Sequence, residues 1–128
     1  MSAVLDAGAL IAIERRDLSF GAVMLVAQRR GIDLVTSSAA VAQVWRGGDT
    51  RGQVNLARQL KGIAQRDLTS AAAREIGNLL RDAGTSDVVD GHIAVLARVG
   101  DTVHTSGMED IALLLGCRGV RAAVERVG

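Results

Sequence analysis

Short segments that favour β-strands alternate along this chain with longer segments of helical periodicity. The expected strands are residues 3–5, 33–36, 62–68, 102–104 and an edge strand at 120–124. The expected helices are residues 7–14, 20–30, 39–46, 50–60, 70–82, 87–99 and 108–115. Strands separated by helices pair in parallel, because the helix carries the chain back across the sheet. The pattern therefore predicts an α/β fold, a three-layer α/β/α sandwich with a central, mostly parallel sheet.

The length and composition of the chain fit one soluble domain, which we expect to span residues 1–128. No apolar stretch is long enough to span a membrane. The N-terminus lacks the charged and apolar regions of a secretion signal. A single cysteine, Cys117, excludes an internal disulfide and suits a reducing compartment. We therefore expect a cytoplasmic protein that makes no membrane contact.

The charge of the chain attracts nucleic acid only weakly. The formal net charge is +1, and Lys61 is the only lysine among the 15 basic residues. Arginine suits phosphate because its planar fork can bind two oxygens, but a genome rich in arginine codons explains the same bias. Aromatic residues make up 2% of the chain, so stacking of bases on a row of aromatic side chains is excluded as the main binding mode.

Acidic residues lie beside apolar segments at three separate points. Asp6 directly follows the first strand, Asp87 and Asp90 begin one helix, and Glu109 and Asp110 begin the last helix. Parallel α/β sheets keep their ligand sites at the carboxyl ends of the strands. Carboxylates that converge there repel one another unless a proton or a divalent cation lies between them. The positions of these acids therefore point to a cation site at that edge of the sheet.

Most of these acids also have a structural explanation, which the sequence leaves open. Asp6 fits the N-cap of the helix that follows it, and Asp87 fits the acidic first turn of another helix. Asp90 lies three residues after Asp87, on the same helical face, and is less well explained in this way. Ser106 and Glu109 have the spacing of a capping box, so Glu109 is expected to be structural.

Four segments of the chain resemble the PIN-domain family, specifically the VapC-type ribonuclease toxins of bacterial toxin–antitoxin pairs. They stand in the family's order and cover nearly the whole chain: residues 4–10, 40–46, 90–97 and 105–107. In the family, each segment carries an acidic residue. The first and third segments have their acids in Asp6 and Asp90, and Asp87 precedes the third as an acid often does in the family. The second and fourth have Gln43 and Gly107 in the acid's place.

The resemblance implies a metal-dependent endoribonuclease. In such a site, one or two Mg²⁺ or Mn²⁺ ions activate water and stabilise the charge on the phosphate that is cut. It also implies that Asp6, Asp87 and Asp90 are catalytic and that Asp6 and Asp90 are the metal ligands. Without acids at two of the four positions, we expect metal binding to be weak or absent and cleavage to be slow. Asp110 lies one turn beyond the glycine and is a candidate to replace the fourth acid.

The resemblance further implies three partners: RNA, a VapB-like antitoxin peptide that blocks the cleft, and a second copy of the chain. Val23, Met24 and Val26 form an apolar helical stripe that suits a homodimer. Arg46 remains either a contact to RNA phosphate or a solvated arginine. Trp45 is expected in the core or in an interface.

Two alternative interpretations of the sequence remain open. The chain can be a degenerate PIN domain that has kept the fold and its partners but lost catalysis, and so acts as a binding module. It can also be an unrelated small α/β domain, such as a receiver whose acids bind Mg²⁺ for phosphorylation, but such a site needs a lysine and Lys61 falls in a helix. His92 is expected to point away from Asp90, and His104 to be a core histidine.

Overall fold

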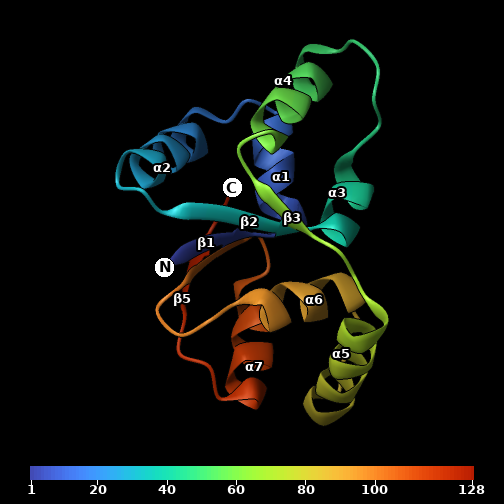
Figure 1. Ribbon diagram of the computed structural model, residues 1–128. Helices are drawn as coiled ribbons and strands as arrows, with labels where there is room; N and C mark the ends of the chain where they lie inside the picture. The colour runs from blue at the N-terminus through green and yellow to red at the C-terminus, as the bar shows by residue number, and fades with distance from the viewer.

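A five-stranded sheet lies between two layers of helices in the computed structural model of residues 1–128 (Figure 1). The strands are β1 (Ser2–Leu5), β2 (Asp33–Ser37), β3 (Ala64–Arg66), β4 (Thr102–Thr105) and β5 (Ala123–Arg126). The helices are α1 (Ala7–Glu14), α2 (Leu18–Arg29), α3 (Ser38–Val44), α4 (Arg51–Leu60), α5 (Ser70–Ala83), α6 (Val88–Leu96) and α7 (Met108–Arg118). Helices α1–α4 lie on one side of the sheet and α5–α7 on the other (Figure 1). The predicted three-layer α/β/α fold is confirmed.

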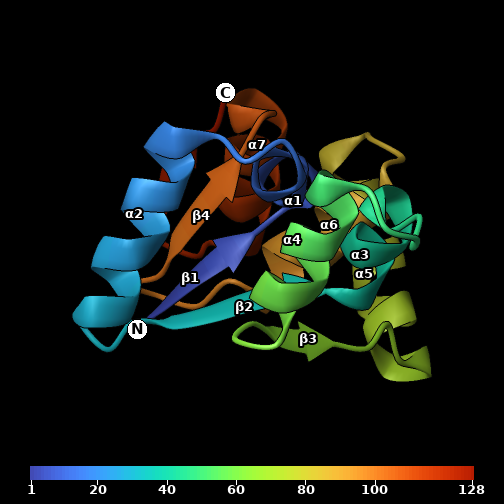
Figure 2. The same cartoon turned by 90° about the horizontal axis from the view of Figure 1, so that it is seen from above.

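All five strands are parallel, in the order β3-β2-β1-β4-β5; Figure 2 shows β3, β2, β1 and β4 side by side. The chain runs from β1 outward to β3 and then returns to β4 on the other side of β1. The strand order therefore reverses between β1 and β4, and open α/β sheets bind ligands outside the carboxyl ends of the strands at such a point.

The strand register fixes which residues meet at this edge. Leu5 pairs with Thr36 of β2 and with His104 of β4. The next residue of each strand, namely Asp6, Ser37 or Thr105, therefore lies in one row at the carboxyl ends. The backbone N–H of Asp6 donates to the carbonyl of His104 at 3.1 Å, which continues the ladder by one residue.

The two helical layers bury the centre of the sheet. Val4, Leu5 and Val103 on β1 and β4 are fully buried, as expected of a parallel sheet covered on both faces. Leu10 of α1 and Ile93 of α6 are also fully buried, one on each side. Each such side chain contributes roughly 1.5–3 kcal/mol through the removal of its surface from water. The central strands are thus a rigid base for the residues that leave their ends.

All the predicted helices and strands are present, and many of their ends differ from the prediction by one to three residues. Helix α1 spans the predicted residues. The N-cap of α6 is Asp87, whose carboxylate accepts from the N–H of Asp90 at 2.9 Å. The helix ends at Leu96 rather than residue 99, because Ala97 takes an extended conformation with ψ 134°. Strand β5 starts at Ala123, three residues later than expected.

The capping box predicted at the start of α7 is wrong. The N-cap of α7 is Gly107, which has no side-chain hydrogen bond. The Ser106 side chain packs instead against Gly8 of α1, where an added Cβ would lie 2.3 Å from Ser106 Oγ. Glu109 is therefore an exposed residue of the first turn, with no capping role.

Two further expectations concern the surface. None of the seven helices has both the length and the apolar composition of a membrane-spanning segment. Trp45 is not in the core, because 43% of its surface is exposed. Trp45 directly follows α3. The alternative expectation, that Trp45 lies in an interface, stays a prediction.

Candidate functional site

Four carboxylates from three parts of the chain gather near the carboxyl ends of β1 and β4. Asp6 follows β1, Asp87 and Asp90 begin α6, and Asp110 lies in the first turn of α7. Asp87, Asp6 and Asp110 all act electrostatically on Asp90. The arrangement agrees with the expectation that Asp6, Asp87 and Asp90 meet at one edge, and the structure adds Asp110, whose direction the sequence left open.

Asp6 is buried and has one structural bond. Its Oδ1 accepts from the N–H of Ala9 at 2.9 Å, so Asp6 is the N-cap of α1. Its second oxygen, Oδ2, accepts no hydrogen bond within the protein. Because no fully buried side-chain oxygen lacks a partner, Oδ2 is not completely enclosed. The structural role and a ligand role are therefore compatible, because each uses a different oxygen of the same carboxylate.

Asp90 has the most perturbed acidity in the chain. The pKa of Asp90 is raised from 3.8 to about 6, mainly by burial and then by the charges of Asp87, Asp6 and Asp110, in that order of importance. Each of these effects disfavours the ionised form. The cluster thus lacks countercharge, so a proton or a cation is attracted to it.

Two buried polar residues at the edge where the four carboxylates gather connect α6 to the sheet. Ser37 Oγ and His92 Nδ1 are 2.6 Å apart, and both residues are buried. Burial lowers the pKa of His92, so its ring is neutral at pH 7. The hydrogen bond ties α6 to the end of β2, and it directs His92 toward the sheet while Asp90 is only partly buried. The sequence analysis did not identify Ser37 as a residue of the site. Its position at the end of a strand, level with Asp6, is the signal that could have identified it.

Thr36 and Thr105 are the second pair of buried polar residues at this edge. Thr36 Oγ1 donates to the carbonyl of Leu5 at 2.6 Å, and Thr105 Oγ1 accepts from the N–H of Gly107 at 2.9 Å. These bonds join β1 to β2 and fix the turn between β4 and α7. The three central strands therefore end in a hydrogen-bonded row, which holds the backbone around Asp6 in place.

Gly107 lies in the cluster, but it has no side chain to contribute. A Cβ added to Gly107 would lie 3.7 Å from Asp110 Oδ2 and 3.9 Å from Thr105 Oγ1. The carboxylate of Asp110 thus lies next to the position that the fourth acid of the resemblance would occupy. The φ of Gly107 is −117°, which any residue can adopt.

Gln43 and Arg46 are not drawn into the cluster by any contact. Gln43 is exposed on α3 and makes no hydrogen bond within the protein. Arg46 Nη1 donates to the carbonyl of Trp45 at 2.6 Å and to that of Ala42 at 3.4 Å. The guanidinium therefore caps the end of α3, and the expected contact with RNA phosphate requires it to give up these bonds.

The structure also gives the positions of Lys61 and His104. Lys61 precedes β3, so it lies at the amino edge of the parallel sheet, opposite Asp6. A receiver-type site, which needs a lysine beside its acids, is therefore not assembled. His104 is buried as expected, packs edge-on against Phe20 with ring centres 5.6 Å apart, and lies 3.8 Å from Glu125 Oε2.

The donor set fits a weakly held ion better than a tightly held one. No group of three or more His, Cys, Asp or Glu side chains is placed to hold a metal ion. Magnesium needs only one or two carboxylates when water fills its other positions. Asp6 and Asp90 supply oxygen donors of the right chemistry, with Asp87 and Asp110 as further negative charge.

We expect Asp90→Asn to stabilise the metal-free protein at pH 7 by on the order of 1 kcal/mol, after allowance for solvent screening of a partly exposed group. The pKa of Asp90 is raised to about 6 in the folded protein, above its ordinary value of 3.8. Its ionisation therefore disfavours folding, and the wild-type protein should lose stability as the pH rises from about 4 to about 7, whereas the variant does not lose this contribution.

Urea unfolding in EDTA across this pH range measures the difference. The pKa values of His92 and His104 are lowered, so protonation of these residues destabilises the protein as the pH falls. This contribution is the same in the wild type and the variant. The matched control is Asp82→Asn, which removes an exposed carboxylate paired with Arg81 at 3.0 Å. Equal pH profiles for the wild type and Asp90→Asn would show that the pKa of Asp90 is not raised in the folded protein.

Comparison with known proteins does not identify the site, so its chemistry is inferred from the side chains alone. The sequence matches no protein-family model and no curated protein. The structure brings together a buried carboxylate, a partly buried carboxylate with a raised pKa and two exposed ones beside the ends of the central strands. Such a cluster attracts a divalent cation and repels a phosphate whose charge is not compensated.

Proposed function

We propose that this chain is a VapC-like PIN-domain protein, a metal-dependent endoribonuclease of weakened activity. One observation carries the proposal: Asp6, Asp87, Asp90 and Asp110 gather at the point where the strand order reverses. The raised pKa of Asp90 marks this place as one that gains from a bound cation. The order of the acids along the chain supports the resemblance from which the proposal begins.

Each of the acids has a part in this chemistry. A divalent ion held by Asp6 and Asp90 would supply an activated water and stabilise the charge of the scissile phosphate. Asp6 keeps one oxygen on the N–H of Ala9, which fixes the orientation of its carboxylate. Asp87 accepts from the N–H of Asp90, so it sets the first turn of α6. The hydrogen bond between Ser37 and His92 holds that helix against the sheet.

The proposal predicts slow RNA cleavage that requires Mn²⁺ or Mg²⁺ and is lost in Asp90→Asn. The assay is a time course on a mixed-sequence RNA, with EDTA as the metal-free condition. Asp82→Asn is the matched control, because it removes a carboxylate that is paired with Arg81 on α5. Cleavage that persists in EDTA, or that survives in Asp90→Asn, would refute a metal site at this position.

A degenerate PIN domain is the second candidate. The specific observations in its favour are that Gln43 and Gly107 bring no charge and that no three ligands are placed together. In that case the protein binds its partners but leaves RNA intact under every metal condition. The same assay separates the two candidates, provided that the purified protein is folded.

The partners that accompany either candidate are a VapB-like antitoxin, RNA and a second copy of the chain. Helix α2 supports the last of these, since Val23, Leu25 and Val26 are 42–47% exposed. Met24, in contrast, faces the core. Val23 and Val26 lie three residues apart on one face of α2; exposed apolar side chains on one face are typical of an interface, and a homodimer through α2 would cover them.

A further inference from the structure

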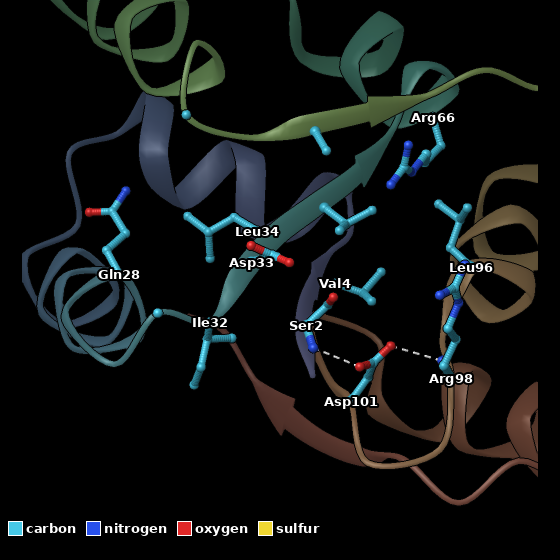
Figure 3. Close-up of a pocket in the computed structure, with 14 residues that line it drawn as sticks. Ser2, Val4, Gln28, Ile32, Asp33, Leu34, Arg66, Leu96, Arg98 and Asp101 are labelled. Carbon is cyan, nitrogen blue, oxygen red and sulfur yellow. Dashed lines mark hydrogen bonds between the residues drawn. The ribbon is translucent and has the colours of Figure 1, made fainter.

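A cavity of about 500 Å³ lies against the sheet, and none of the four clustered carboxylates lines it (Figure 3). Its floor is a row of three side chains from β1, β2 and β3: Val4, Val35 and Ala64. These residues pair in register across the sheet, so they point to the same face. The cavity is thus built on regular strands, and its volume falls within the range of small-molecule sites, roughly 300–1,000 Å³.

One wall of the cavity carries two arginines with Leu96 between them (Figure 3). Arg66 lies two residues after Ala64 on β3, so it projects from the same face of the sheet. Arg98 follows the end of α6. Neither guanidinium forms an ion pair or donates a hydrogen bond within the protein. Arg118, by comparison, donates to the carbonyls of Ala94 and Ala97 at 2.7 and 2.9 Å.

A buried carboxylate makes the Arg98 end of this wall rigid. Asp101 accepts from the backbone N–H of Ser2 at 2.7 Å and from that of Arg98 at 2.9 Å. Each oxygen of Asp101 is therefore used by the backbone, and Asp101 is only 4% exposed. The backbone of Arg98 is thus fastened to β1, while its guanidinium remains free for a ligand.

The opposite part of the cavity has a different chemistry. Gln28 and Ile32 lie along the far wall, and the carboxylate of Asp33 lies between the two walls (Figure 3). The side chains of Asp33 and Gln28 make no hydrogen bond or ion pair within the protein. They offer an acceptor and a mixed donor–acceptor to the hydroxyl or amino groups of a ligand.

We propose that this cavity binds a small organic phosphate of about mononucleotide size, with its phosphate group held by Arg66 and Arg98. Two guanidinium groups match the charge of a phosphate monoester, which is about −1.5 to −2 at pH 7. A carboxylate carries a single charge, which one guanidinium fork already satisfies. The rest of the ligand would lie on the row of Val4, Val35 and Ala64 and meet Asp33 with its hydroxyl groups. The inference does not depend on the acidic cluster.

Calorimetric titration with adenosine 5′-monophosphate tests the proposal, with adenosine as the probe that lacks phosphate. We expect the wild type to bind the nucleotide with a Kd below about 1 mM and adenosine at least about tenfold more weakly. Arg66→Ala with Arg98→Ala should abolish the binding. Arg66→Lys with Arg98→Lys should restore part of it, because lysine keeps the charge but loses the planar fork. Arg74→Ala, an exposed arginine of α5, is the matched control and should bind as the wild type does.

Two further titrations identify the source of the phosphate. A short RNA with a 5′-phosphate and the same RNA with a 5′-hydroxyl separate a free nucleotide from a nucleic-acid end, and a preference for either phosphorylated probe supports the site. Binding of the nucleotide that is equal in the wild type and in the double alanine variant would overturn the proposal. So would the absence of binding by any phosphate probe at about 10 mM. Thermal melts of the variants show whether each one is folded, and the lysine pair keeps the test valid if the alanine pair is not.

Discussion

Gln43→Glu combined with Gly107→Asp is expected to raise Mn²⁺-dependent RNA cleavage by at least roughly tenfold, about 1.4 kcal/mol of barrier. Cleavage of a phosphodiester with two metal ions needs charge on both the attacking and the leaving side. If the proposed resemblance to the PIN family holds, Gln43 and Gly107 stand at two of the four positions at which the family has acids. The two substitutions restore these acids and should increase the population of metal-bound protein.

The backbone of Gly107 permits the change. Its φ of −117° is in the region open to all residues, and the nearest atom to an added Cβ is Asp110 Oδ2 at 3.7 Å. The new carboxylate would therefore lie next to that of Asp110 and repel it in the absence of metal. The double variant should melt below the wild type in EDTA, and Mn²⁺ should recover part of the difference, because a ligand that binds only the folded state stabilises it.

Three controls make the result specific. Adding Asp6→Ala to the double variant should abolish the gain, since it removes a proposed ligand. Gln65→Glu with Gly77→Asp adds the same two charges at exposed positions on β3 and α5 and should leave the rate unchanged. If the unmodified chain already cleaves RNA well, and Asp110→Asn stops it, then Asp110 is the fourth acid and the site is complete without Gly107→Asp.

The fold was predictable because each level of the sequence points to the same answer. The alternation of strands and helices required parallel pairing, and the apolar segments matched the buried strands. Asp6 was predictable at the carboxyl edge of the sheet because it follows β1, and Asp87 and Asp90 because they begin the helix that returns the chain to the start of β4. The N-cap role of Asp6 was also visible, since an aspartate that immediately precedes a helix is a common cap.

What the sequence did not reveal depends on contacts between distant segments. The capping box failed because Ser106 packs against Gly8, nearly 100 residues earlier in the chain. The phosphate cavity needs the register of three strands and the end of α6, and neither Arg66 nor Arg98 has a local pattern that marks it. Gly91 is a similar case: an added Cβ would lie 2.7 Å from Ile76 Cγ2, so the glycine permits α6 to approach α5 closely.

Gly8→Ala is expected to destabilise the protein by about 1–3 kcal/mol, the usual range for overpacking. Helix propensity alone predicts the opposite sign, because Ala is favoured over Gly in a helix by up to about 1 kcal/mol. The new Cβ would lie 2.3 Å from Ser106 Oγ, 2.6 Å from Ser106 Cβ and 3.1 Å from its backbone N. Rotation of the hydroxyl relieves only the first of these contacts, so the backbone between β4 and α7 must move. That backbone leads into Gly107 and carries the N-terminus of α7 with Asp110, so any metal-dependent activity should also fall.

Equilibrium unfolding in urea of four proteins isolates this contact: the wild type, Gly8→Ala, Ser106→Gly and the double variant. The double variant should recover at least about 1 kcal/mol of the loss, a coupling energy of the size found between contacting residues. Gly77→Ala is the matched control, since Gly77 lies in α5 with nothing within 4 Å of the added Cβ. It should stabilise the protein by up to about 1 kcal/mol. Opposite signs for the two glycine substitutions would establish that α1 sets the position of the turn after β4. If Gly8→Ala were as stable as the wild type, that turn would be free to move, and the gathering of Asp110 with Asp6 would not depend on the packing of α1.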